Sequence, residues 1–432
     1  MESISVGLLG LGTVGSGVVQ IIDEHQDKLM HQVGCKVSVK KILVRTLSKD
    51  RNIYLNGSRL TDDPSDILND PSIDVIIEVM GGIEHTRNYI LQALQNKKHV
   101  ITANKDLMAV HGSELLQVAL ENKCDLFYEA SVAGGIPILR SLVEGLASDR
   151  IKKMMGIVNG TTNYILTKMS QEGREYGEVL HEAQDLGYAE ADPTSDVEGL
   201  DAARKIAILG TLGFSMKVDL DDVSVSGISN VSKEDLEYCH QLGYTMKLIG
   251  IADRTEDKVE ISVQPTLVPH SHPLAAVHNE FNAVYVYGEA VGETMFYGPG
   301  AGKLPTATAV VSDLVEVAKN MRLGVNGNSV ILPQYSKKIK SDEEIFAKYF
   351  LRIHAKDQPG TFAALTSVFS NHQVSLEKIL QLPLDEGNLA EIIIVTHIVS
   401  KRNYDFIIQQ LNDLDVVEQV KSSYRVEGDD NR

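Results

Sequence analysis

The stretch GLLGLGTVGSGVV, residues 7–19, decides the fold of the N-terminal part of this 432-residue chain. Its glycines Gly10, Gly12 and Gly15 have the spacing GxGxxG, after the strand-like ISVGLL and before the helical pattern GVVQIIDEHQDKL. Such a strand turns sharply, passes a pyrophosphate without an intervening Cβ atom, and enters a helix whose N-terminal amides face the anion. An ordinary glycine-rich turn would use the same residues, but the strand, the helix and the N-terminal position together predict dinucleotide binding.

The same stretch is also apolar enough to suggest an export signal or a membrane span, since no charged residue lies between Glu2 and Asp23. Five glycines, several hydroxyl residues and Gln20 dilute this apolarity, and the residue after Met1 is acidic. No A-x-A cleavage pattern follows. We therefore expect neither a targeting segment nor a membrane partner.

The overall composition is that of an ordinary globular protein, with 43% hydrophobic and 23% charged residues in a chain long enough for two or three domains. A formal net charge of -18 argues against a nucleic-acid partner, which normally meets a basic face. Cys35, Cys124 and Cys239 form no C-x-x-C pair, and no His/Cys cluster suggests zinc. This cysteine usage suits a reducing cytoplasm, so we expect a cytoplasmic protein.

Strand-like and helix-like segments alternate through the first 132 residues. The strands are KVSVKKILV from residue 36, DVIIEVM (74–80), HVITAN (99–104) and DLFYEASV (125–132), and helical patterns at 87–98 and 113–123 separate them. This alternation predicts a doubly wound parallel sheet, hence an α/β fold with a Rossmann-type nucleotide-binding domain.

The rest of the chain divides into three parts. Helices and alternating strands between residues 150 and 302 predict an α+β substrate and oligomerisation domain, and the helix after the glycine-rich 297–303 stretch is expected to return to the nucleotide domain. The polar segment PQYSKKIKSDEEI resembles a linker, and a βαββαβ pattern follows it. The predicted domains are 1–149 (completed by about 303–333), 150–302, a linker at 334–346, and a small ferredoxin-like domain at 347–432.

The second strand ends in VRT, where an acidic residue would usually hold the ribose 2'-hydroxyl. Arg45 occupies this place, and Lys49 and Arg51 are close in sequence. An arginine there can pair with a 2'-phosphate, although a solvated cation after a buried strand is also common. We therefore favour NADP, with NAD possible.

Two lysines have settings that favour chemistry over simple solvation. Lys105, in ITANKDLMA, follows a strand whose carboxyl end should point at the nicotinamide. Asp201 and Lys205 are four residues apart on one helix face, where a surface ion pair is the plain alternative. The remainder of that helix is apolar, so we expect the pair to be buried or in a cleft, where a charge is costly.

Three further segments offer polar groups to a ligand. The loop GYAEADPTSD concentrates Glu190, Asp192 and Asp196, which could hold a substrate ammonium group or form a solvated turn. NGTTNYIL (159–166) could bind a small carboxylate or be a plain helix cap. EASVAGGIPI (129–138) has a kinked backbone whose carbonyls could hold a hard cation, or is only a tight turn.

Taken together, GLGTVG, TANK, EASVAGGIP, NGTTNYIL, GYAEADPTSDVEGLDAARK and GPGAGKLPTA closely resemble the homoserine dehydrogenase family over nearly the whole chain. The tail resembles the amino-acid-binding ACT domain. The resemblance implies a reversible, nicotinamide-dependent interconversion of L-homoserine and L-aspartate 4-semialdehyde in threonine and methionine synthesis.

The resemblance also implies roles for individual positions. Lys205 is expected to be the proton donor and acceptor, with a lowered pKa, or to stay charged while water relays the proton. Lys105 is expected beside the cofactor. A sodium ion is expected on backbone oxygens. The implied sets are Glu190, Asp196, Asp201, Gly160, Thr161 and Tyr188 for substrate; Gly10, Leu11, Gly12, Thr13, Val14, Gly15, Arg45, Lys105, Gly187 and Gly302 for cofactor; and Glu129, Val132, Gly134 and Ile136 for sodium.

The ACT-like tail leads us to expect a feedback effector, with L-threonine the foremost candidate, seated at the DQPG turn of Asp357–Gly360. We expect a homodimer or homotetramer. Two other functions remain open at this point: another amino-acid dehydrogenase with an ACT tail, and a non-catalytic sensor that binds a dinucleotide and an amino acid. The sensor would not need two lysines and three acids in one cleft.

Overall fold

The computed structural model describes residues 3–49, 51, 53–328, 331–384 and 388–428. The chain divides into two compact units, each assembled from three segments. The predicted domain ranges 1–149, 303–333 and 347–432 each include a few positions that lie outside the described residues. Unit 1 comprises Met1–Met154, Arg204–Asp222 and Asn282–Lys337, and unit 2 comprises Met155–Ala203, Val223–Phe281 and Lys338–Arg432.

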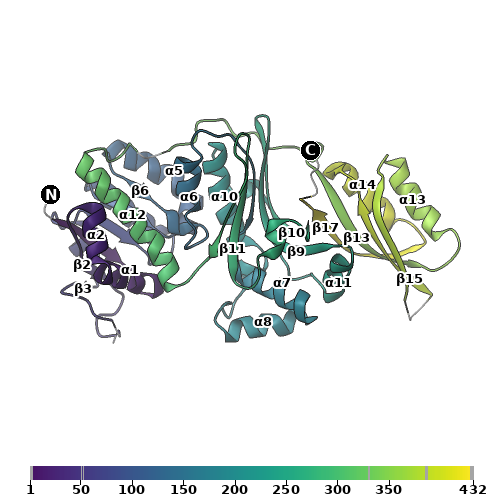
Figure 1. Ribbon diagram of the computed structural model, residues 1–432, viewed down its shortest axis with the longest axis horizontal. Coiled ribbons are helices and arrows are strands. Elements are labelled where there is room, and N and C mark those ends of the chain that lie inside the picture. Colours follow the sequence, from purple (N-terminus) through teal and green to yellow (C-terminus); the bar gives the residue numbers. More distant parts are fainter. Residues whose placement is uncertain (1–2, 50, 52, 329–330, 385–387, 429–432) are drawn as a thin grey trace. The chain divides into compact units, whose positions relative to one another are not determined.

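Unit 1 contains a six-stranded sheet in the order β3-β2-β1-β4-β5-β6, and every pairing is parallel (Figure 1). This order is that of the dinucleotide-binding Rossmann fold, so the predicted doubly wound sheet is confirmed. The strands are β1 (Ser3–Leu9), β2 (Lys36–Leu43), β3 (Arg59–Thr61), β4 (Val75–Glu78), β5 (His99–Thr102) and β6 (Leu126–Phe127), and the helices between them are α1 (Thr13–Glu24), α2 (Gln26–Val33), α3 (Ser65–Leu68), α4 (Glu84–Gln95) and α5 (Lys105–Asn122).

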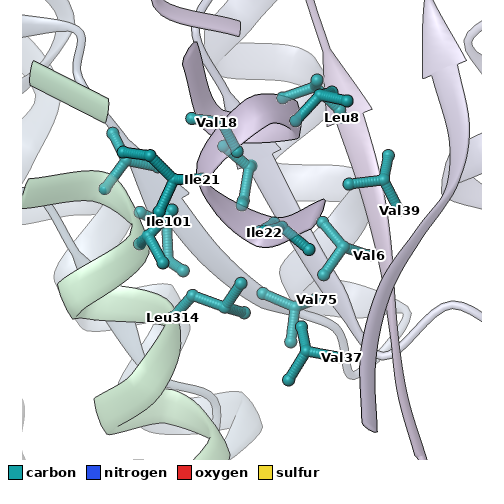
Figure 2. Packing of buried hydrophobic residues seen from close by; sticks show 14 of the residues in the cluster. Val6, Leu8, Val18, Ile21, Ile22, Val37, Val39, Val75, Ile101 and Leu314 are labelled. Carbon is teal, nitrogen blue, oxygen red and sulfur yellow. The ribbon is translucent and has the colours of Figure 1, made fainter. Parts of the chain in front are cut away.

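The core of this unit is built mainly from β-branched and leucine side chains on the central strands and on three helices, and Figure 2 shows part of it. Val6 and Leu8 of β1 and Ile22 of α1 are fully buried, and Leu314 brings α12 (Lys303–Leu323) into the same cluster. Each such side chain contributes roughly 1.5–3 kcal/mol on burial. The backbone of α12 lies so close to α1 that a Cβ atom on Gly17 would meet the carbonyl oxygen of Lys303 at 2.5 Å.

The predicted strand at 125–132 is shorter than expected, because β6 ends at Phe127 and a 3-10 turn (η1, Glu129–Ser131) follows. Ala133 and Gly134 then take left-handed conformations, with φ of 54° and 49°, which no continuing strand would allow. Unit 1 also contains α6 (Ile138–Arg140), η2 (Ser141–Gly145), the start of β7 (Ile151–Ile157), most of α10 (Leu200–Phe214), η3 (Leu220–Asp222), nearly all of β11 (Phe281–Gly288), and β12 (Gly292–Pro299).

Unit 2 begins with a helical part, followed by a long antiparallel hairpin. In that hairpin β9 pairs residue by residue with β10, and β8 runs parallel to β10 on its other side. The elements are α7 (Gly160–Glu172), α8 (Tyr176–Asp185), α9 (Thr194–Val197), β8 (Val223–Val225), α11 (Lys233–Gln241), β9 (Tyr244–Thr255), β10 (Lys258–Pro269) and η4 (Pro273–Ala276).

The C-terminal part of unit 2 has the predicted βαββαβ order, with antiparallel strands in the sequence β17-β13-β15-β14. Apolar residues of these strands, α13 and α14 form their own core. This is the ferredoxin-like fold expected for the tail. Its elements are β13 (Phe346–Lys356), α13 (Thr361–Asn371), β14 (Leu376–Pro383), β15 (Leu389–Thr396), β16 (Val399–Ser400), α14 (Lys401–Asn412) and β17 (Val417–Val426).

The C-terminal sheet is attached to the rest of unit 2 through backbone pairing and buried charges. β17 runs parallel to β10 at Thr266 and Leu267. Beside this pairing, the guanidinium of Arg425 is buried against the carboxylates of Glu260 and Glu427. Removing one partner of a buried ion pair leaves a charge without compensation, so we expect this junction to resist separation.

The segment 334–346, predicted as a linker, is held by its lysines. In unit 1, Lys337 Nζ lies 2.7 Å from carboxylate oxygens of both Asp219 and Asp222. In unit 2, Lys340 is buried and pairs with Asp253. The predicted domain boundaries themselves stay a prediction. None of the helices in the described ranges is both long and apolar enough to cross a membrane.

Candidate active site

The glycine-rich turn after β1 has the geometry that the sequence motif predicts. Gly10 has a φ of 104°, and a Cβ atom there would lie 3.0 Å from the carbonyl oxygen of Val79. A Cβ atom on Gly15 would lie 2.2 Å from the carbonyl oxygen of Gly10, so only glycine fits. A Cβ atom on Gly12, by contrast, would meet nothing within 4 Å. Gly12 thus presents an open backbone surface at the N-terminus of α1, where a phosphate can approach.

An open pocket of about 840 Å³ lies against this turn. Its lining includes Gly10 to Gly12, residues 43–46 at the end of β2, and residues 79–86 after β4. Arg45, Lys49 and Arg51 line it as well, so the structure brings the three predicted cations to one cavity. Arg51 donates hydrogen bonds to the carbonyls of Lys49 and Thr46, at 2.8 and 2.7 Å, and thereby orders the loop that carries Arg45.

A buried carboxylate that was not predicted from the sequence stabilises the turn after β4, whose residues 79–82 line this pocket. Glu78, at the end of β4, accepts hydrogen bonds from the backbone amides of Met80 and Gly81 and from the Thr102 hydroxyl. Burial raises the pKa of Glu78, and these donors oppose the rise. Gly81 and Gly82 have φ of 74° and 78°. An acid that ends a buried strand before two glycines is the signal that could have identified this turn.

An ion pair between Asp106 and Arg204 lies beside both predicted lysines, because Lys105 precedes Asp106 and Lys205 follows Arg204 in the sequence. Lys105 is the first residue of α5, where the Asn104 side chain accepts a hydrogen bond from Leu107 N. The next residue, Asp106, lies 2.7 Å from Arg204 Nε on α10. Lys205 follows Arg204, and both lysines are half-buried. The ion pair therefore joins the start of α5 to the lysine-bearing turn of α10, within unit 1.

In unit 2 the structure brings two of the six predicted substrate residues, Asp196 and Asp201, to the side chain of Asn159. The Asn159 side-chain amide donates to Asp196 Oδ1 at 2.7 Å and to Asp201 Oδ2 at 2.8 Å. Its side-chain oxygen, Oδ1, accepts from Thr162 N at 2.8 Å and so caps α7. Sequence reading proposed this turn without proposing Asn159, although an asparagine before a helical GTT is a recognisable N-cap. Close by along the chain, Thr161 Oγ1 donates to the Tyr188 backbone carbonyl at 2.6 Å. We call these five residues the carboxylate cluster: Asn159, Asp196, Asp201, Thr161 and Tyr188.

Three predicted residues of this region lie at its margin. Gly160 follows Asn159 directly, and a Cβ atom there would lie 2.6 Å from the Glu280 carbonyl oxygen. Glu190 is exposed, and its backbone carbonyl accepts a hydrogen bond from Gln184 Nε2 at 3.1 Å. Gly187 is exposed with φ of 77°. The structure therefore gathers the two aspartates but does not bring Glu190 into hydrogen-bond contact with them.

The segment predicted to bind sodium is buried and held rigidly. Glu129, Val132, Gly134 and Ile136 are all buried. Backbone amides of Leu139 and Arg140 bind the Glu129 carboxylate, both at 2.8 Å, and the Glu129 carbonyl accepts from Val132 N at 3.4 Å. No group of three or more His, Cys, Asp or Glu side chains among the described residues could hold a metal ion. A metal in this region would thus need other oxygen ligands, such as backbone carbonyls or a side-chain amide.

Neighbouring groups in unit 1 also bear on this segment. Asp313 accepts from Glu129 N at 3.0 Å and from the Arg140 guanidinium at 2.8 Å, and burial raises the pKa of Asp313 to about 8. The Oδ1 atom of Asn282 is buried without a hydrogen-bond partner, beside Gly300. A Cβ atom on Gly134 would itself meet the Gly300 carbonyl at 2.2 Å. An unsatisfied buried oxygen close to this backbone turn fits a hard cation or a water.

The remaining predicted cofactor residue, Gly302, is the exposed N-cap of α12 and has a φ of 126°. It precedes a 21-residue helix whose apolar face is part of the nucleotide-domain core. An open helix N-terminus of this kind suits an anionic group. Unit 1 therefore offers phosphate-binding backbone and two lysines, and unit 2 offers a paired-carboxylate cluster suited to an amino acid's ammonium group.

Comparisons with known proteins agree with this chemistry. Residues 10–129 match the family described as homoserine dehydrogenase, NAD binding domain; residues 137–315 match homoserine dehydrogenase; and residues 349–416 match the ACT domain. The chain is 67% identical to a homoserine dehydrogenase of Bacillus subtilis over 99% of both chains.

Two solved structures extend the likeness to three dimensions. The first is a homoserine dehydrogenase from Thiobacillus denitrificans, with a TM-score of 0.93 and 39% identity over 99% of both chains. The second is a hyperthermophilic archaeal homoserine dehydrogenase in complex with NADPH, with a TM-score of 0.62 and 26% identity, covering 73% of this chain and 97% of that one.

Proposed function

This chain belongs to the homoserine dehydrogenase family, and on that premise we propose that it interconverts L-homoserine and L-aspartate 4-semialdehyde with a nicotinamide cofactor. It is an oxidoreductase with an NAD-binding domain. The observation that carries the proposed substrate is the carboxylate cluster, in which one amide orients two aspartates. We place the reaction in the synthesis of threonine and methionine.

The proposed cofactor is NADP, with NAD as a weaker ligand. The pocket beside Gly12 is large enough for a dinucleotide, and its backbone turn, formed by Gly10, Leu11, Gly12, Thr13, Val14 and Gly15, would hold the pyrophosphate. Arg45 is exposed and lines this pocket just after the end of β2, which suits a 2'-phosphate. The archaeal relative solved with NADPH supports this choice. When bound, the nicotinamide ring supplies the hydride acceptor and donor.

Lys205 is the proposed proton-transfer group. Oxidation of a primary alcohol requires a base to take the hydroxyl proton as hydride leaves carbon, and the reverse reaction requires an acid at the same oxygen. Lys205 is half-buried, and Asp201 lies one turn earlier on the same helix, α10. The Arg204 to Asp106 ion pair would fix the turn that presents Lys205.

We propose that the carboxylate cluster binds the substrate's ammonium group. Asp201 is buried and Asp196 is half-buried, and the Asn159 amide orients one oxygen of each carboxylate. The amides at Gly160 and Thr161, in the first turn of α7, suit the substrate carboxylate. Tyr188 and Glu190 would close the site from the exposed loop.

A sodium ion is proposed on the backbone carbonyls of Glu129, Val132, Gly134 and Ile136. Its support is the buried left-handed turn and the unsatisfied Asn282 oxygen beside Gly300. The role of such an ion would be structural, because it would lock the segment between β6 and α6.

The C-terminal domain is proposed to bind L-threonine and to inhibit the enzyme. Thr361, the first residue of α13, is buried, and its hydroxyl lacks a hydrogen-bond partner. The amides that follow Gly360 face the same end of this 11-residue helix. An orphan hydroxyl at a helix N-terminus favours an amino-acid carboxylate as the missing partner.

Two general properties remain proposals. We propose a homodimer or homotetramer. The support is the resemblance of the tail to ACT domains, which bind their ligands between paired copies. We also propose a cytoplasmic enzyme, supported by three buried cysteines, all of them free thiols.

The activity is tested by following NADPH absorbance at 340 nm after addition of L-aspartate 4-semialdehyde. We expect oxidation of NADPH, a slower rate with NADH, and reduction of NADP when L-homoserine is supplied instead. Folded protein that leaves the absorbance unchanged in both directions would contradict the proposal. Turnover with a different amino-acid aldehyde alone would assign the chain another substrate.

A further inference from the structure

A second polar pocket lies in unit 2, outside every group assigned above. It is open, has a volume of about 770 Å³, and is lined by side chains from α7, α11, β9 and the segments on either side of η4. Its ionisable lining residues are Lys247, His240, His270, His278 and Glu237. We call it the histidine pocket.

Lys247 is the most unusual of these residues, because its side chain is only 1% exposed. Its ammonium group donates to Asn163 Oδ1 at 3.0 Å and to the Val277 carbonyl at 2.5 Å. Both acceptors are neutral, and burial lowers the pKa of Lys247 to about 7 without a carboxylate to oppose the fall. A lysine has three N–H donors, so one is left after these two bonds. A buried cation with neutral partners is stabilised by any anion that reaches it.

The histidines add donors to the same pocket. His270 Nε2 lies 3.0 Å from the Tyr244 carbonyl, so this nitrogen carries a proton, and its ring centroid is 5.0 Å from that of His240. His278 Nδ1 lies 3.5 Å from Gln171 Nε2; the amide donates, and the other ring nitrogen of His278 keeps its proton. Burial and the charge of Lys247 lower the pKa of His278. An anion would reverse this effect.

Most of the ionisable groups that face the pocket are basic. Lys247 comes from β9, His270 follows β10, and His278 follows η4, while α11 contributes both His240 and Glu237. The lining residues of α7 are uncharged, and the nearby Lys168 and Glu172 of that helix pair with each other at 2.7 Å. Glu237 is therefore the single carboxylate among the lining residues, and it is exposed.

We propose that the histidine pocket is a binding site for a small oxyanion, a phosphate or carboxylate group, held by Lys247 and the three histidines. This site is separate from the dinucleotide pocket and from the carboxylate cluster. It contacts the last turns of α7, whereas the first turn of the same helix contributes Thr161 to the carboxylate cluster.

The test uses the full chain and two probes, inorganic phosphate and acetate, in isothermal titration calorimetry at pH 6.0 and pH 8.0. Lys247, whose pKa burial lowers to about 7, is charged at pH 6.0 and largely neutral at pH 8.0. Acetate keeps a single negative charge over this range, so it should bind about tenfold more tightly at pH 6.0. The double variant His240→Gln with His278→Gln removes two exposed rings and should weaken binding about tenfold or more. Tighter binding of acetate than of phosphate would identify a carboxylate ligand; the reverse order would identify a phosphate.

Two matched controls locate the site. His31→Gln removes an exposed histidine of α2 in unit 1 and should leave phosphate binding unchanged. Saturating NADP, which would fill the dinucleotide pocket, should also leave this binding unchanged. If the double histidine variant binds phosphate as the unaltered protein does, or if NADP abolishes the binding, the ion is an adventitious ion only or belongs to the cofactor pocket, and the proposal fails. Absence of binding by both probes overturns it as well. Thermal unfolding of each variant identifies loss of fold, in which case single His278→Gln decides.

Discussion

The dinucleotide pocket and the carboxylate cluster are built by different means. The pocket beside Gly12 is made by backbone: a strand, a turn with no Cβ atoms, and a helix N-terminus within one short stretch. The cluster is made by side chains from α7, the loop before α9, α9 and α10, joined through the Asn159 amide and the Thr161 hydroxyl.

This difference predicts how the two regions respond to substitution. Backbone sites tolerate change in most side chains, because their donors are amides that every residue carries. A side-chain cluster with buried carboxylates depends on each partner, since a single lost donor leaves a charge unsatisfied. Substitutions in the two regions should therefore have different kinetic signatures.

The largest effect is expected at Lys205. Lys205→Ala should lower kcat by about 100-fold or more, because a general acid or base typically contributes that much. Cofactor affinity, measured by NADPH fluorescence titration, should stay nearly unchanged. Lys217→Ala, which removes a lysine of unit 1 paired with Asp219, is the matched control and should leave kcat intact. A Lys205 variant that retains most of its turnover would remove this residue from the proton-transfer step.

The next effect is expected in the carboxylate cluster. Asn159→Ala removes the donor shared by Asp196 and Asp201 and leaves a buried carboxylate less satisfied. We expect kcat/KM for homoserine to fall about 30-fold, with an unchanged dissociation constant for the cofactor. Asn412→Ala, at an exposed position at the end of α14, serves as control. Equal losses in substrate and cofactor binding would indicate that Asn159 only supports the fold.

A cofactor-specific effect is expected at Arg45. Arg45→Ala should weaken NADP binding by about 1 to 3 kcal/mol through loss of a charge-assisted contact, and should hardly change NAD binding. Arg59→Ala removes an exposed arginine of the neighbouring β3 and should affect neither cofactor. If both cofactors lose the same affinity at Arg45→Ala, that arginine is structural.

The smallest effect is expected in the C-terminal domain. Deletion after residue 340 would expose β10 and leave Glu260 without Arg425, so a point variant is cleaner than truncation. Thr361→Val should raise the midpoint of threonine inhibition about tenfold, within the usual range of coupling energies, while kcat stays the same. Ser367→Ala, an exposed position on the same helix, is the control. Threonine inhibition that is identical in Thr361→Val would place the effector elsewhere.

Local sequence predicted the elements whose residues are contiguous. The glycine spacing at Gly10 to Gly15, the parallel sheet and the βαββαβ tail all follow from patterns within one or two segments. The expected strand at 125–132 ends early at Phe127, because a 3-10 turn follows at Glu129–Ser131 whose first amide donates to Asp313, far along the chain.

The hydrogen-bond partners could not be read from the sequence for the same reason. Asn159 reaches Asp196 and Asp201 across about 40 residues, and Asp106 meets Arg204 across about 100, so no local period indicates either contact. The buried Lys247 was missed because it lies in an ordinary strand pattern, and only the fold shows that its partners are neutral.

The most direct test of the central claim is a crystal structure of the ternary complex with NADP and L-homoserine. The account predicts the pyrophosphate on the turn of Gly10 to Gly15, the homoserine ammonium against Asp196 and Asp201, and the homoserine hydroxyl within hydrogen-bond distance of Lys205 Nζ. A homoserine molecule bound away from Asp201, or a hydroxyl bonded to a group other than Lys205, would contradict it.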